Sequence, residues 1–179
     1  MLDRLIDLFI QFITLFRVFV FVNEFDGAVV MRRGKCNRVL TPGLQWVIPL
    51  GQEAVLTANT KPEPMYLDVQ SLVCGDGYAA NIQVGIIWRI TDIKTFLVEN
   101  EDTEGMIGML CAGAVTRSVQ SAKWADLRKA EYPATLRAPM NRKVRKRGAE
   151  IDDVIIQDFT AGSADRLWHE GISIAVGED

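Results

Sequence analysis

The 179-residue sequence has little of what most enzyme sites require. It holds one histidine, His169, and its three cysteines, Cys36, Cys74 and Cys111, are widely spaced and form no C-x-x-C pair. Zinc sites draw on closely spaced Cys and His, so an odd number of isolated cysteines predicts reduced thiols. We therefore expect no metal, no cofactor and no catalytic residues, and a hydrolase that uses Ser or Cys is disfavoured.

An excess of positive charge is also missing. The 20 Lys and Arg residues are outnumbered by 23 Asp and Glu residues, which gives a formal net charge of −3 at pH 7. Nucleic-acid binding calls for a surface basic enough to neutralise phosphates, so no nucleic-acid partner is expected. The composition, with 49% hydrophobic and 24% charged residues, is that of an ordinary globular domain or two small subdomains.

No apolar run reaches the length of about 20 residues that crosses a bilayer, but the N-terminal segment comes close. Fourteen residues between Leu5 and Val22 are Leu, Ile, Phe or Val, and together they favour insertion by about 6 kcal/mol. Asp7 and Arg17 oppose insertion by up to about 3 kcal/mol each at bilayer depth. A helix that spans the bilayer alone is therefore marginal.

Residues 1–22 are predicted to form an amphipathic helix that associates with a membrane. We favour a helix that lies in the interface with its polar stripe toward the headgroups, over one that inserts and hides the stripe against other copies. An amphipathic core helix of a soluble domain is the competing interpretation, whereas Asp3 argues against a secretory signal peptide. The side chains expected to contact lipid are Leu5, Leu8, Phe9, Phe12, Ile13, Leu15, Phe16 and Phe19.

Four cations, Arg32, Arg33, Lys35 and Arg38, follow this segment closely. If the segment spans, they place the rest of the chain on the cytoplasmic side. If it lies flat, they attract anionic headgroups by about 1 kcal/mol each. Ordinary solvated hairpin charge explains them equally well.

Beyond residue 22 the hydrophobic period becomes that of strands and then, after Thr91, that of helices. Strands are expected over residues 28–32, 38–40, 45–50, 53–58, 64–71, 79–90 and 150–159. Asp92 is a candidate N-cap, and helices are expected over 105–121 and 134–148, where Pro139 either kinks the helix or marks its first turn. The predicted fold class is α+β. An N-terminal membrane helix precedes a mostly antiparallel β subdomain over 23–97, an α/β subdomain over 98–160 and a short tail over 161–179.

The order of these elements resembles the SPFH, or Band 7, family of stomatins, prohibitins and flotillins. Asn23 to Gly34 (NEFDGAVVMRRG) resembles the family's opening strand and turn, and Thr41 to Leu44 with Ile48-Pro49 is similar to its PGL…IP hairpin. Three further phrases match in order: Cys74 to Gly77 before a long strand that ends in Trp88-Arg89, Met109 to Leu127, and Glu150 to Asp158.

This resemblance implies a non-enzymatic scaffold that self-assembles laterally on a membrane and organises lipids or membrane proteins such as proteases or channels. One departure concerns Thr160 to Asp179, where the family usually has a long coiled coil. This stretch has three glycines and no heptads, so we do not expect a coiled-coil wall from it. The alternative is a structural subunit of a larger membrane or viral hetero-assembly.

Two stretches of opposite charge suggest how copies could meet. Glu99 to Glu104 is acidic and Arg142 to Arg147 is basic, and complementary patches on one chain permit head-to-tail rings. Each stretch is explained as well by simple solvation. The candidate contact residues are Glu101, Asp102, Arg142, Arg145 and Lys146.

Overall fold

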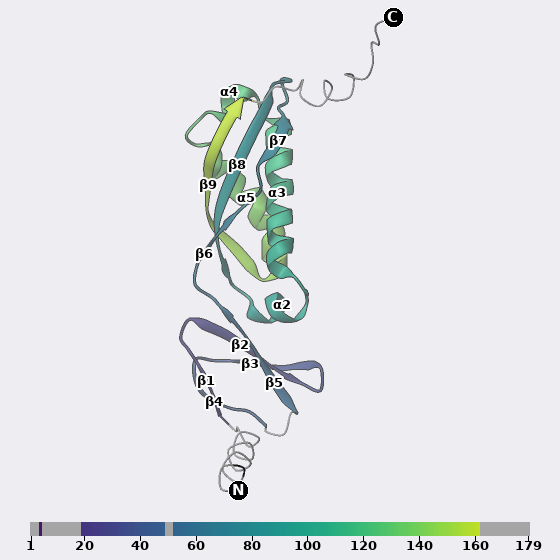
Figure 1. Ribbon diagram of the computed structural model, residues 1–179, viewed down its shortest axis with the longest axis vertical. Helices are drawn as coiled ribbons and strands as arrows, with labels where there is room; N and C mark the ends of the chain where they lie inside the picture. The colour runs from purple at the N-terminus through teal and green to yellow at the C-terminus, as the bar shows by residue number, and fades with distance from the viewer. Residues whose placement is uncertain (1–3, 5–18, 49–51, 162–179) are drawn as a thin grey trace, which may run out of the picture. The chain divides into compact units, whose positions relative to one another are not determined.

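The computed structural model describes residues 4, 19–48 and 52–161. These residues form a mixed α+β fold with mostly antiparallel sheets, which confirms the predicted class (Figure 1). The chain divides into two compact units that interleave in sequence. Unit 1 comprises Met1–Glu63, Arg89–Glu104 and Arg145–Glu150, and unit 2 comprises Pro64–Trp88, Gly105–Val144 and Ile151–Asp179. The sequential division at residue 97 stays a prediction.

Unit 1 contains two small antiparallel sheets. In the first, β2 (Asp26–Arg32) lies between β3 (Lys35–Leu40) and β5 (Glu53–Asn59). In the second, β1 (Phe19–Val22) pairs with β4 (Gly43–Trp46). The buried side chains of Val22, Ala28, Val30 and Leu40 form a shared core, against which Val20 and Val55 pack.

Among its described residues, unit 1 also contains one short helix and one 3-10 turn. Helix α2 (Ile93–Val98) begins at Asp92, whose carboxylate accepts hydrogen bonds from the backbone N–H groups of Lys94 and Thr95, as the N-cap prediction requires. The turn η1 (Arg145–Arg147) leads to Gly148, which has a left-handed φ of 78°. A Cβ at Gly148 would lie 2.3 Å from the backbone oxygen of Asp92, so only glycine fits there.

Unit 2 is built on a four-stranded sheet. The long strand β8 (Ala79–Ile90) pairs with β6 (Glu63–Tyr66), β7 (Gln70–Val73) and β9 (Ala149–Ala161). Helices α3 (Thr103–Ser121) and α5 (Tyr132–Val144) cover one face of this sheet, and α4 (Trp124–Leu127) joins them (Figure 1).

The core of unit 2 follows the two expected periods. Alternate residues of β8 are buried, and both helices bury apolar residues spaced three or four apart. The side chains with no solvent exposure include Ile107 and Val119 on α3, and Leu136, Met140 and Val144 on α5. Pro139 lies inside α5, which excludes the alternative that it marks the first turn.

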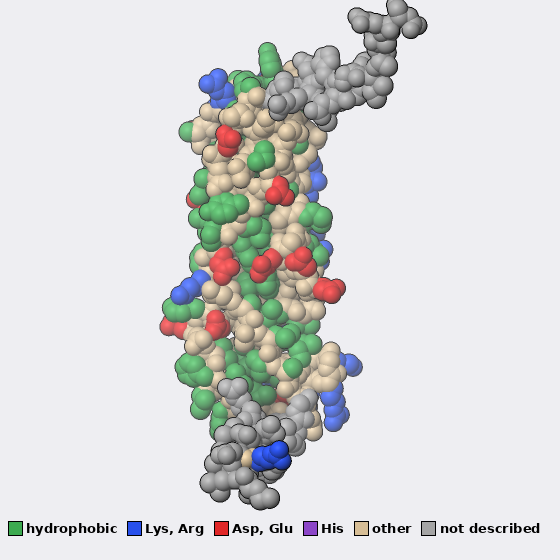
Figure 2. All heavy atoms as spheres, in the orientation of Figure 1, with side chains coloured by type: hydrophobic (Ala, Val, Ile, Leu, Met, Phe, Trp, Pro, Cys, Tyr) green, Lys and Arg blue, Asp and Glu red, His purple; other side chains and the backbone are tan. Residues whose placement is uncertain are grey.

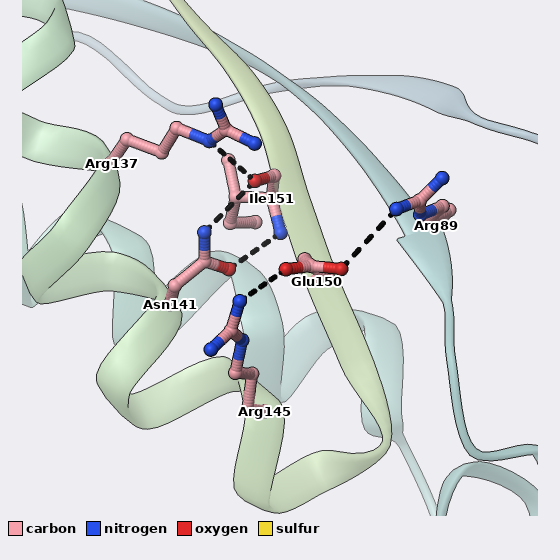
Figure 3. Close-up of polar contacts among 6 residues, drawn as sticks. All are labelled: Arg89, Arg137, Asn141, Arg145, Glu150 and Ile151. Carbon is pink, nitrogen blue, oxygen red and sulfur yellow. Dashed lines mark hydrogen bonds and ion pairs between the residues drawn. The ribbon is translucent and has the colours of Figure 1, made fainter.

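A buried amide joins α5 to β9. The side chain of Asn141 accepts a 2.7 Å hydrogen bond from the backbone N–H of Ile151 and donates a 2.9 Å bond to the carbonyl of the same residue (Figure 3). Arg137 Nε donates a further bond of 3.1 Å to this carbonyl. Asn141 therefore occupies the place that a neighbouring strand would take at Ile151.

Several expectations from the sequence are wrong in detail. The strand expected over 45–50 is β4, which ends at Trp46, and the helix expected over 134–148 ends at Val144 and continues as the 3-10 turn η1. The predicted N-terminal helix does not extend to residue 22, because Phe19–Val22 is a strand that pairs with β4 and alternates exposed side chains with partly or fully buried ones. The single strand expected over 64–71 is two strands, β6 and β7, separated at Leu67 to Val69. The rest of the predicted helix lies outside the described residues. Within the described part of the chain, no helix combines the length and apolar character needed to cross a membrane.

Candidate membrane-facing surface and contacts between copies

The outward side of the β1–β4 strand pair is apolar. Antiparallel register sets Phe19 opposite Trp46 and Phe21 opposite Leu44. Side chains alternate between the two faces of a strand, so these four share one face while Val22 points into the core. We call Phe19, Phe21, Leu44 and Trp46 the β1–β4 face.

These four side chains remain substantially exposed. Their exposed fractions are 43% for Phe19, 69% for Phe21, 64% for Leu44 and 65% for Trp46, and hydrophobic side chains reach the surface at this strand pair (Figure 2). The rings of Phe19 and Trp46 meet edge to face with centroids 4.6 Å apart. A contiguous apolar patch marks an interaction site, and Trp favours membrane interfaces because its ring is apolar and its N–H polar.

Positive charge borders the β1–β4 face. The Arg38 guanidinium donates a hydrogen bond to the backbone oxygen of Trp46 and lies 4.0 Å from the Glu53 carboxylate. A hollow beside Trp46 is also lined by Arg32 and Asn37. An apolar surface with arginines at its rim suits the boundary between acyl chains and headgroups.

The tip of the β2–β3 hairpin adds further cations. Arg32, Arg33 and Lys35 are exposed, and Figure 2 shows Lys and Arg side chains gathered at this tip. The turn places Arg33 and Gly34 at φ values of 51° and 76°, as a two-residue hairpin of mirror-image type requires. Arg33 is thus held outward by a tight turn.

The structure describes one of the eight residues predicted to contact lipid. Phe19 lies on the β1–β4 face, whereas Leu5, Leu8, Phe9, Phe12, Ile13, Leu15 and Phe16 lie outside the described residues. Sequence reasoning missed Phe21, Leu44 and Trp46. The alternation of large apolar residues in FVFV and in GLQW was a usable indication, because period two places them on one side of each strand.

Arg145, one of the predicted contact residues between copies, is paired within unit 1. Its guanidinium donates a hydrogen bond to Glu150, whose other oxygen lies 3.3 Å from Arg89 (Figure 3). The hydrogen bond from Arg145, and secondly that from Arg89, lowers the pKa of Glu150. Arg145 therefore has a carboxylate partner in its own chain.

The other predicted contact residues lie at three places. Glu101 and Asp102 are exposed in the segment between α2 and α3, where Arg147 donates a 2.9 Å bond to the side chain of Asn100. Lys146 is exposed in η1. Arg142 lines a groove between α3 and α5 in unit 2.

The described side chains offer little for catalysis. Burial raises the pKa of Cys111 to about 12, and burial together with the charge of Asp76 raises that of Cys74. Both thiols are buried, so neither is an activated nucleophile. Among the described residues, no group of three or more His, Cys, Asp or Glu is placed to hold a metal ion.

An α+β domain with an exposed apolar strand pair has the features of a binding or assembly protein. The chain belongs to the SPFH domain / Band 7 family, whose sequence profile matches residues 21–164. This match confirms the resemblance carried by the sequence phrases. Proteins of this family associate with membranes and oligomerise, and they are generally non-enzymatic scaffolds.

One curated relative aligns with most of the chain. The uncharacterized protein MJ0827 of Methanocaldococcus jannaschii is 22% identical over 145 residues, which cover 80% of this chain and 72% of that protein. Its name assigns no activity.

Proposed function

We propose that this protein is a non-enzymatic scaffold that is tethered to a membrane by its N-terminal segment and assembles laterally there. In this proposal the segment up to residue 18 and the β1–β4 face contact the same leaflet. The rest of the chain lies on the cytoplasmic side, and the assembly organises lipids or membrane proteins such as proteases.

The observation that carries the proposal is the β1–β4 face. It begins at Phe19, directly after the apolar N-terminal segment, so both surfaces are joined by covalent continuity. Exposed apolar area of this kind is unfavourable in water and gains about 25 cal/mol per Å² when it leaves water. The cations Arg32 and Arg38 line the hollow beside Trp46, where anionic headgroups would be.

The position of β1 decides how the tether should be tested. A deletion of residues 1–22 would remove Val22 from the core of unit 1, so it would disturb the fold as well as the tether. Deletion of residues 1–18 leaves β1 and its pairing with β4 intact. This shorter deletion separates loss of the anchor from loss of structure.

Vesicle flotation of the full chain tests the proposal. We expect the deletion of residues 1–18 and the triple variant Phe21→Ser, Leu44→Ser, Trp46→Ser each to weaken binding to vesicles that contain anionic lipid. Phe21, Leu44 and Trp46 are about two-thirds exposed, and burying each side chain contributes about 1–2 kcal/mol, so the triple variant should lose at least about tenfold in partitioning.

The matched control changes three exposed apolar residues of unit 2. Val73→Ser, Tyr78→Ser and Met109→Ser alter side chains that are 51%, 62% and 68% exposed, and this variant should float like the wild type. Equal flotation of the wild type and the β1–β4 variant would refute lipid contact by this face. Full binding after deletion of residues 1–18 would refute the tether.

A further inference from the structure

We propose that the basic groove between α3 and α5 receives the acidic stretch Glu99 to Glu104 of a second copy of this chain. The groove carries Arg117, Arg142 and Lys143. This inference rests on the lateral assembly proposed above and assigns it a contact. Arg145, which the sequence suggested for this contact, is not part of it, because its guanidinium already pairs with the Glu150 carboxylate.

Helical spacing builds the groove within unit 2. Its α3 wall is the stripe Ala114, Arg117, Ser118 and Ser121, which occupy positions i, i+3, i+4 and i+7 and therefore lie on one face. Its α5 wall has the same spacing at Pro139, Arg142 and Lys143. Small side chains on α3 leave the groove hollow, and the cations border it.

The groove carries uncompensated positive charge. The described residues that line it include three cations and no carboxylate. Arg38, Arg89, Lys129 and Arg145 all have ion-pair partners, whereas among the described residues no carboxylate pairs with Arg117, Arg142 or Lys143. An anionic ligand would relieve the repulsion among these cations, and the planar guanidinium groups can each bind a carboxylate with two parallel hydrogen bonds.

The same chain supplies a carboxylate-rich segment that is ordered and accessible. Glu99, Glu101 and Glu104 are exposed, and the hydrogen bond from Arg147 to Asn100 holds the segment near its start. This stretch belongs to unit 1 up to Glu104, while the groove belongs to unit 2. Two different surfaces that fit one another produce head-to-tail association, which can continue from copy to copy.

A second copy suits this groove better than an isolated anion. Copies held on one membrane are concentrated relative to one another, so exposed ion pairs of modest strength suffice. Lipid phosphate is the competing anion, and the experiment below separates it from the carboxylates of a neighbour.

Charge reversal in the full-length protein tests the contact. In detergent solution, cross-linking and mass photometry should show association weakened at least about tenfold by Arg142→Glu with Lys143→Glu, and similarly by Glu99→Lys with Glu101→Lys. Combining all four changes in one chain should restore most of the association, because the charges again complement one another. Association should also fall as salt rises.

The control reverses two exposed cations outside the groove, Arg128→Glu and Lys146→Glu, and should leave assembly size unchanged. If the groove reversal does not fold, Arg142→Gln with Lys143→Gln should weaken association in the same direction. Unchanged association in the groove variants, or no recovery in the combined variant, would overturn the inference.

Flotation on neutral and on anionic vesicles completes the test. Loss of binding to anionic vesicles only, with assembly in detergent unchanged, would assign the groove to lipid phosphate and overturn the contact between copies. If the wild-type protein does not float at all, the proposed membrane function fails, while the charge-reversal result in detergent still decides the contact.

Discussion

The two units of this protein place their apolar side chains differently. In unit 2, most apolar residues of β8, α3 and α5 are buried in one core, where Ile107, Leu136 and Met140 have no solvent exposure. In unit 1, β1 sends Val22 into the core and Phe21 outward, and Leu44 and Trp46 of β4 are outward as well. Unit 2 thus buries most of the large apolar residues of these elements in its own core, whereas in unit 1 four large apolar side chains share one exposed face of a strand pair.

The largest expected effect is the loss of core packing in unit 2. Leu136→Ala removes a fully buried side chain and should lower the free energy of unfolding by about 2–5 kcal/mol, because it leaves a cavity. Urea unfolding followed by circular dichroism measures this loss. Met109→Ala, at an exposed position of α3 in the same unit, should change it by less than about 0.5 kcal/mol. Equal losses in the two variants would contradict the assignment of the core.

The next effect concerns the backbone of unit 1. Gly148→Ala should cost about 2–4 kcal/mol, since it adds left-handed strain to a Cβ that would lie 2.3 Å from Asp92 O. Gly77, at a φ of 88°, has nothing within 4 Å of its Cβ position, so Gly77→Ala carries the strain alone, about 1–2 kcal/mol. The difference between the two melting temperatures isolates the clash, and a larger shift for Gly77→Ala would refute it.

A somewhat smaller effect tests the buried amide of unit 2. Asn141→Leu leaves the N–H of Ile151 without the partner described here and should cost about 1–3 kcal/mol. Hydrogen exchange should show faster exchange at the Ile151 amide. Asn37→Leu, which removes an exposed amide bonded to Glu53, serves as the control and should leave the stability of the protein nearly unchanged.

The smallest effect is the pH dependence of Glu150. Its pKa is lowered in the folded state by Arg145 and then by Arg89, so its contribution is complete above the ordinary pKa of 4.5 and is lost as pH falls through the lowered value. The stability difference between wild type and Glu150→Gln should therefore be constant near pH 7 and shrink below about pH 4.5. A stability difference that grows as pH falls would contradict this prediction.

Local sequence patterns predicted much of the fold. The alternation along Ala79–Ile90 gave β8 with its observed bounds, Asp92 was found as an N-cap, and the helix expected over 105–121 differs from α3 by two residues. These features depend on neighbours in the chain, so local periodicity and capping suffice to find them.

Features that depend on distant partners were harder to predict. The sequence predicts a helix at Phe19–Val22 because these residues continue an apolar run. The segment is a strand only because it pairs with Gly43–Trp46. The same pairing creates the β1–β4 face, and the packing of α3 beside α5 gathers Arg117 with Arg142. Glu150 could not be foreseen as the partner of both Arg145 and Arg89, because Arg89 is 61 residues away in sequence.

A fluorescence measurement tests most directly whether unit 1 meets lipid while unit 2 does not. An environment-sensitive NBD dye is attached through Leu44→Cys in one protein and Met109→Cys in another, both with Cys36→Ser, because Cys74 and Cys111 are buried. On adding anionic vesicles, the dye at position 44 should brighten and shift to shorter wavelength, and the dye at position 109 should not change. An unchanged dye at position 44 on protein that floats with the vesicles, or equal changes at both positions, would contradict this account.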